Sequence, residues 1–128
     1  MYNKSITLTI WGRELDLEVE HDCFEGEEIT SIQKETYEEF MSNFEEIFAD
    51  AHSMIKDFCM ENYSAYVTDN FVNIFRYIKP KQLYIKRSVT NKRIAGILCS
   101  FKFDMEHGLA IYIENGKVST VGTQDIIL

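Results

Sequence analysis

The first twenty residues carry two runs in which apolar and polar residues alternate strictly, at 6–10 and 15–19. A period of two is typical of half-buried β-strands. Gly12-Arg13 lies between the runs and suits a two-residue turn that begins with glycine. This turn places Ile10 opposite Leu15 and brings the six apolar residues of both runs onto one face. The pattern therefore predicts a β-hairpin over residues 5–20.

The apolar period then changes to three and four residues, which is typical of an amphipathic helix. Thr30 and Gln33 have the spacing of a capping box, so we expect the helix to begin there. No Gly or Pro interrupts the pattern up to about Asn62, where we expect it to end. Asp69 is the predicted cap of a second, shorter helix, which Pro80 would terminate.

Residues 82–127 alternate again and predict a four-stranded antiparallel meander. We expect a three-residue loop over 90–92, a five-residue loop over 104–108 and a type I′ turn at Asn115-Gly116. The second loop would place Phe103 opposite Leu109, and the third would place Ile113 opposite Val118. These registers put one apolar set, which includes Cys99, on a single buried face.

The element order is ββααββββ, and the connections between strands are short. This order predicts a single α+β domain over residues 1–128, a two-layer sandwich. Its sheet would be mainly antiparallel with about six strands, and one long and one shorter helix would cover one face.

Composition narrows the class of protein further. The chain has 128 residues, 45% of them hydrophobic, and only three cysteines. Such a chain buries a core without disulfides or metals, and an odd cysteine count without a CxxC pair disfavours a disulfide scaffold or zinc site. We find no signal peptide, no membrane-spanning run and no phosphate-binding, hydrolase or dinucleotide motif. The chain is expected to be cytoplasmic and to bind no cofactor.

The net charge of −8 is unevenly distributed. Residues 14–61 hold sixteen Asp and Glu against two Lys, a net −14, whereas residues 76–93 hold seven Lys and Arg and no acid. One interpretation is internal balance between an acidic helix and a basic strand. The other is an acidic face that binds a basic protein, and direct nucleic-acid binding is disfavoured. The candidate partner-binding residues are Glu35, Glu38, Glu39, Glu45 and Glu46.

The predicted loop before Gly108 holds the best candidate for chemistry, namely Asp104, Glu106 and His107. A carboxylate and an imidazole on a rigid turn can act as acid and base or hold a metal ion. Asp125, beside Gln124 near the end of the chain, could approach and orient the ring. The structural interpretation is that Asp104 and His107 only cap the turn.

The same stretch resembles a family of small uncharacterised bacterial domains. The shared pattern consists of Asp104-Met105-Glu106-His107-Gly108-Leu109, then Asn115-Gly116, then Val121-Gly122-Thr123-Gln124-Asp125-Ile126. The family often has Trp where this chain has Phe103, and a small residue or glycine at Ala110. The resemblance implies a bacterial cytosolic protein with an α+β fold, and it carries no information about catalysis. Some similar small acidic bacterial domains serve as immunity proteins, an analogy of size and charge.

Two hypotheses follow from the sequence. The first is a non-enzymatic, immunity-like module that uses the acidic surface of the first hairpin and the long helix to bind a basic protein partner. The alternative is a small enzyme or metal-binding domain at Asp104, Glu106 and His107, assisted by Asp125. The partner, any substrate and the oligomeric state are left open by the sequence.

Overall fold

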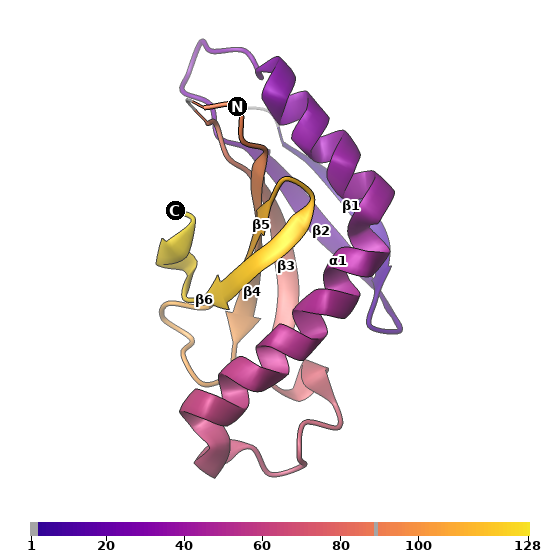
Figure 1. Ribbon diagram of the computed structural model, residues 1–128, viewed down its shortest axis with the longest axis vertical. Helices are drawn as coiled ribbons and strands as arrows, with labels where there is room; N and C mark the ends of the chain where they lie inside the picture. Colours follow the sequence, from indigo (N-terminus) through magenta and orange to yellow (C-terminus); the bar gives the residue numbers. More distant parts are fainter. Residues whose placement is uncertain (1–2, 89) are drawn as a thin grey trace.

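One long helix crosses one face of a six-stranded mixed sheet (Figure 1). The structure is a computed structural model that describes residues 3–88 and 90–128. The sheet order follows the chain order from β1 to β6. The elements are β1 (Asn3–Ile10), β2 (Arg13–His21), α1 (Ser31–Tyr63), η1 (Ser64–Tyr66), η2 (Ile74–Arg76), β3 (Ile78–Ile85), β4 (Ile94–Phe101), β5 (Leu109–Glu114), β6 (Lys117–Gly122) and η3 (Gln124–Ile126).

The predicted first hairpin is present, but its turn lies one residue earlier than expected. Trp11 and Gly12 form the turn, with φ of 50° and 83°, and Ile10 lies opposite Arg13. Positive φ at both positions defines a type I′ turn. The strand pairing is therefore shifted by two residues, and an even shift leaves the same apolar residues facing the core. The indole N–H of Trp11 donates to the Phe48 carbonyl at 2.7 Å, a long-range contact that favours this turn.

The helix α1 begins and ends close to the predicted residues. Thr30 and Gln33 form the capping box, because the Thr30 hydroxyl accepts from the Gln33 amide at 3.1 Å and the Gln33 side chain accepts from the Thr30 amide at 3.0 Å. Its buried stripe faces the sheet, and Tyr63 is its last residue. The buried stripe consists of Gln33, Thr36, Phe40, Ile47, Phe48, Ala51, Ile55 and Cys59.

The predicted second helix is wrong. Residues 67–77 form a loop with the short 3-10 turn η2, and Asp69 caps this loop instead of an α-helix. Its carboxylate accepts from the amide of Phe71 at 3.1 Å and from the hydroxyl of Tyr77. Pro80 does not end a helix but lies inside β3, at the register shift between Pro80 and Gln82. Because proline lacks an amide hydrogen, it fits a strand where the ladder is interrupted.

Because the predicted second helix does not form, β3 runs in the opposite direction to the one expected. β2 and β3 are parallel, with residues 18–21 beside residues 82–85, so the sheet is mixed, although its other four pairings are antiparallel. A single helix returns the chain to the starting end of β2, and the next strand then runs in the same direction. A second helix would have brought the chain back once more and made that pair antiparallel.

The C-terminal meander has the predicted strands and a longer central loop. Ile113 lies opposite Val118 across the Asn115-Gly116 turn, as predicted. Leu109, however, pairs with Cys99 and not with Phe103, and the predicted loop over 90–92 is part of a longer connection between Ile85 and Ile94. Phe103 lies outside the strand, and its ring packs among aromatic residues at the end of α1, 5.0 Å from the Tyr63 ring.

The main core lies between α1 and the sheet, and Cys99 belongs to it as predicted. On the opposite face the C-terminal residues fold back over β4 and β5. Ile127 packs against Leu98 and Ala110, and a side chain at Gly96 would overlap Ile127, with a distance of 2.5 Å between Cβ and Cδ1. The end of the chain therefore covers the part of that face that β4 and β5 form (Figure 1).

Candidate functional site

The predicted turn brings Asp104 and His107 together. The Asp104 carboxylate accepts from the His107 amide at 3.1 Å, and His107 Nδ1 lies 3.0 Å from Asp104 Oδ1. The Gly108 amide donates to the Asp104 carbonyl at 2.8 Å and closes the loop. A turn-initiating Asp that binds amides further along is a common local solution for such loops. The His107 side chain is 62% exposed, so the pair stands at the surface.

The two groups shift each other's pKa. The hydrogen bond from the His107 amide, together with the imidazole itself, lowers the pKa of Asp104 below its ordinary value. The hydrogen bond to Asp104 and its negative charge raise the pKa of His107, and the charges of Glu106 and Asp125 add to this. Each shift favours the charged form of its group, so the pair is an ion pair when His107 is protonated.

The other predicted members of this site do not touch the ring. Glu106 and Asp125 are exposed and act on His107 only through their charge. Asp125 accepts from the Thr123 hydroxyl, and the Gln124 amide donates to the His107 carbonyl at 3.3 Å. Asp104, and not the Gln124-Asp125 segment, therefore orients the imidazole. Within residues 3–88 and 90–128 no group of three or more His, Cys, Asp or Glu side chains is arranged to hold a metal ion.

The first and last parts of the C-terminal sequence pattern contact each other through Gln124. The Gln124 side chain donates to the Cys99 carbonyl at 3.3 Å, which ties the end of the chain to β4. Gly108 lies against this contact, because a Cβ atom there would be 2.5 Å from Gln124 Nε2 and 2.9 Å from the Cys99 carbonyl oxygen. The His107 carbonyl holds the backbone of the same glutamine. These contacts give the pattern a structural role.

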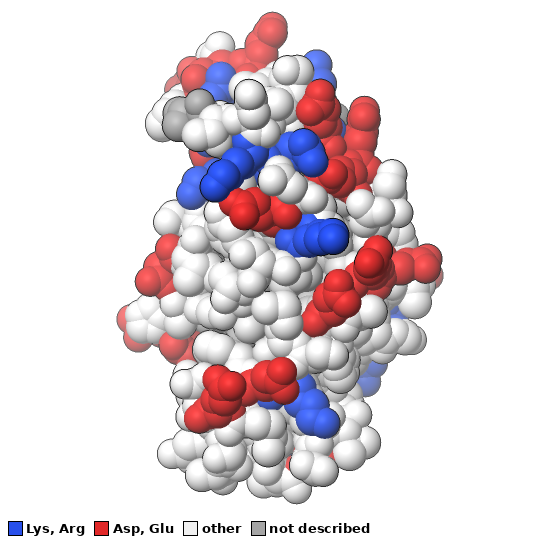
Figure 2. Space-filling model, viewed as in Figure 1, with Lys and Arg blue, Asp and Glu red and all other residues white. Residues whose placement is uncertain are grey.

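The second predicted site lies on α1. Glu35, Glu38, Glu45 and Glu46 are exposed, and we call these four residues the α1 acidic surface. Figure 2 shows acidic groups along the course that α1 takes in Figure 1. Glu39 differs from these four, because its carboxylate binds the Arg93 guanidinium in a bidentate pair, at 2.9 and 3.1 Å. Glu39 therefore holds the start of β4 against α1.

Most of the bases in residues 76–93 form salt bridges within the protein, whereas few of the acids in residues 14–61 are their partners. Four of the seven bases form salt bridges: Arg76, Arg87, Lys92 and Arg93. Their partners include only two of the sixteen acids of residues 14–61, Glu27 and Glu39. Among the described residues, the four members of the α1 acidic surface form no salt bridge. Salt bridges within the protein therefore neutralise most of the bases of residues 76–93, but they leave most of the negative charge of residues 14–61 uncompensated.

The acids of the first hairpin lie on the other side of the molecule. Along β2 the apolar residues face α1, and Glu14, Asp16 and Glu18 point to the opposite face and are exposed. The expected single acidic surface of hairpin and helix is therefore two surfaces, separated by the sheet. The alternation of a strand requires this once the apolar residues cover the core.

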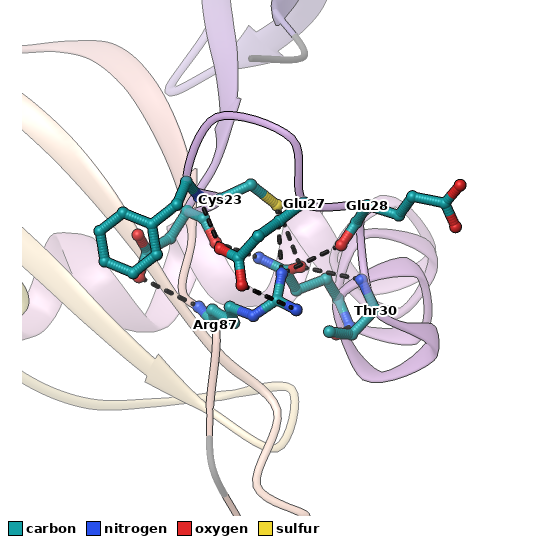
Figure 3. A network of polar contacts seen from close by, with 8 residues as sticks. Cys23, Glu27, Glu28, Thr30 and Arg87 are labelled. Atoms are coloured by element: carbon teal, nitrogen blue, oxygen red, sulfur yellow. Dashed lines mark hydrogen bonds and ion pairs between the residues drawn. The ribbon is translucent and has the colours of Figure 1, made fainter.

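Arg87 is a base of residues 76–93 that binds the loop between β2 and α1. Figure 3 shows its side chain reaching from the end of β3 into the loop between β2 and α1. Its guanidinium donates to the Glu28 carbonyl at 3.0 Å, pairs with Glu27 at 3.4 Å and lies 3.5 Å from the Cys23 sulfur. These contacts attach the helix-leading loop to the sheet, which is a structural role.

A further concave site was not predicted from the sequence. A groove of about 280 Å³ lies where β3 begins and β4 ends, and we call it the basic groove. Arg76, Lys79 and Lys102 contribute its charges, and Phe75 and Met105 contribute apolar surface. Arg76 and Lys79 belong to the bases of residues 76–93, but no local signal links them to Lys102 and Met105, which the sheet brings to the same place.

The fold and these sites define a small acidic α+β domain with a mixed sheet and one covering helix. A family model described as Domain of unknown function (DUF6985) matches residues 1–128, and the chain belongs to this family. This confirms membership of an uncharacterised domain family. Comparison with curated proteins and with solved structures found no match. No helix in residues 3–88 and 90–128 is long and apolar enough to span a membrane.

Proposed function

We propose that the protein is a non-enzymatic binding module whose α1 acidic surface engages a basic protein partner, as immunity proteins engage their toxins. One observation carries the proposal. Within residues 3–88 and 90–128, salt bridges use only two of the sixteen acids in residues 14–61, and the four glutamates of the α1 acidic surface remain exposed. A helix that holds such charges on a rigid face creates a field that speeds association with a partner of opposite charge.

We place the proposed partner-binding surface on α1 alone, because the acids of β2 point away from the side of the sheet that α1 covers. Glu39 is excluded from it because Arg93 occupies its carboxylate. Glu35 contributes to the same pair, since its charge helps to raise the pKa of Arg93. Glu38, Glu45 and Glu46 have no such internal role among the described residues, so they are the members to change in a test.

The test compares two variants with equal charge change. Glu38, Glu45 and Glu46 are replaced by lysine in one variant, and Glu14, Glu18 and Glu25 in the other. The wild type is used for affinity capture from a native lysate at low and then moderate salt, and a captured basic protein is measured against all three proteins by calorimetry. We expect the helix variant to lose at least about 100-fold in affinity, since each close charge pair at an interface contributes on the order of 1.5 kcal/mol or more.

The control variant should stay within about threefold of the wild type at moderate salt, because screening limits charge effects to a Debye length of about 10 Å. Equal losses in both variants would show that only net charge matters. Capture of no specific partner, or of an acidic one, would refute the proposal.

A further inference from the structure

The basic groove combines apolar surface with positive charge. Its accessible apolar surface comes from Phe75, which is half-buried, and from Met105, which has 86% of its surface exposed. Ile78 and Phe101 also line the groove, but they are buried in the core. A methionine so exposed in the loop after β4 contributes nothing to the core, yet it adds a flexible apolar contact to the groove. The groove therefore provides a place for the apolar part of a ligand.

The strand register explains why lysines converge on this groove. Lys79 lies opposite Ser100 in the pairing of β3 with β4. Lys102 follows two residues after Ser100, and its amide donates to the Tyr77 carbonyl at 2.8 Å, which continues the pairing beyond the strand. Side chains two residues apart on adjacent strands share a face about 7–8 Å apart. Lys79 and Lys102 are both exposed and form no salt bridge with any described residue.

One arginine adds positive charge to the groove, and a second arginine contacts one of its lining residues. Arg76 lines the groove, with its guanidinium 3.6 Å from Asp69. Arg13, from the start of β2, lies over the Phe75 ring with 4.4 Å between its Cζ atom and the ring centroid. No acidic residue lines the groove, although the chain carries a net charge of −8. A local excess of positive charge in an acidic protein is complementary to an anion.

We propose that the basic groove binds a small organic anion with an apolar body, such as an aryl or alkyl carboxylate. The apolar body would lie against Phe75 and Met105, and the carboxylate would lie between Lys79 and Lys102. The volume of about 280 Å³ lies just below the range of about 300–1,000 Å³ that is typical of small-molecule pockets, so the ligand must be small. This site lies apart from the α1 acidic surface, so the proposal does not depend on a basic protein partner.

The experiment uses the full chain and three probes: 2-naphthoate, the cation 2-naphthylmethylammonium and inorganic phosphate. Binding is followed in two-dimensional amide NMR spectra. We expect 2-naphthoate to shift the amides of Ser100, Lys102 and Met105 in a saturable manner, because these residues line the groove. The cation should cause no saturable shift there, and phosphate should bind at least about tenfold more weakly, since it lacks the apolar body.

Two variants and a matched control test the assignment. Lys79→Gln with Lys102→Gln should weaken naphthoate binding at least tenfold, and Met105→Ser should weaken it about threefold or more. Lys56→Gln with Lys117→Gln makes the same charge change at exposed lysines outside the groove and should leave binding unchanged. All these side chains are exposed, so the dispersion of the spectra should be retained.

Four outcomes would overturn the proposal. These are saturable shifts elsewhere only, equal binding of the naphthyl cation, equal binding of phosphate, and equal losses in the groove and control variants. A groove occupied by a second copy of the chain would also overturn it, and that case would appear as line broadening that increases with protein concentration in the absence of any probe.

Discussion

At the scale of single residues, His107 acquires its properties from a turn of four residues. Asp104 binds both its amide and its ring, and the ring remains exposed. The pKa of His107 is raised, so its charged form stabilises the folded state at pH values below the ordinary histidine pKa of about 6.5. That contribution is lost as the pH rises through the folded-state pKa. Asp104 acts in the opposite direction, because its lowered pKa stabilises the fold until the pH falls through that lowered value.

We therefore expect the His107 ring to titrate in NMR spectra with a midpoint above about 6.5. Asp104→Asn should lower the midpoint, because the first and second contributions to the shift come from Asp104. Asp125→Asn is the matched control and should lower it less, since Asp125 acts through charge without touching the ring. A wild-type midpoint at or below the ordinary value, or one unchanged by Asp104→Asn, would contradict this account.

Gly108 and Gly12 allow a comparison between backbone strain and crowding. Both have positive φ, at 62° and 83°, but only Gly108 is surrounded closely, by Gln124 and the Cys99 carbonyl. Replacing either by Ala should cost about 1–2 kcal/mol in the free energy of unfolding through backbone strain alone. Gly108→Ala should cost more, because the backbone carbonyl of Cys99 cannot move away. Urea unfolding measures both, and equal losses would show that Gln124 and Cys99 adjust freely.

At the scale of elements, Gln33 links the start of α1 to the sheet. This side chain is fully buried, and its amide group donates to the carbonyls of Asp22 and Ile85 at 3.1 and 3.2 Å. Its oxygen accepts from the Thr30 amide as part of the capping box. One glutamine therefore joins the start of α1 to the ends of β2 and β3. The capping box was predicted, but the two long-range bonds were not, because they require the parallel strands to lie side by side.

Gln33→Ala should reduce the free energy of unfolding by about 3 kcal/mol. The change removes three hydrogen bonds of the Gln33 side chain, to the Asp22 and Ile85 carbonyls and from the Thr30 amide, and each contributes about 1 kcal/mol. Thr30→Ala is the matched control, because it removes the cap and keeps Gln33, and it should cost about 1 kcal/mol. Urea unfolding followed by circular dichroism measures both. If Gln33→Ala costs no more than Thr30→Ala, the helix is attached mainly by its apolar stripe.

The elements that were predicted wrongly share a physical cause. Asp69 can cap an α-helix or a short loop, and only the contact with Tyr77 shows which occurs. Phe103 continues an alternating pattern, yet its ring leaves the strand to join Tyr63 and Tyr77. Local patterns describe what a segment prefers in isolation, and aromatic packing between distant segments can outweigh that preference.

At the scale of the whole molecule, the sheet determines on which surfaces the charged side chains lie. It separates the acids of β2 from those of α1, and it brings Lys79 and Lys102 to one groove beside Arg76. The protein thus presents an acidic helix, an acidic strand face and a basic groove in different places. The total charge of −8 contains none of this information.

The sequence by itself determined which face of the first hairpin and of α1 is buried, where α1 begins and ends, and the turn at Asn115-Gly116. These depend on periodicity and on side chains within a few residues, which the chain carries locally. Only the tertiary structure decided the strand registers, the parallel pairing of β2 with β3, and the groups that meet at each site. Registers that differ by an even number of residues bury the same face, so the apolar pattern cannot distinguish them. Contacts of Trp11 and Phe103 with distant residues make that choice.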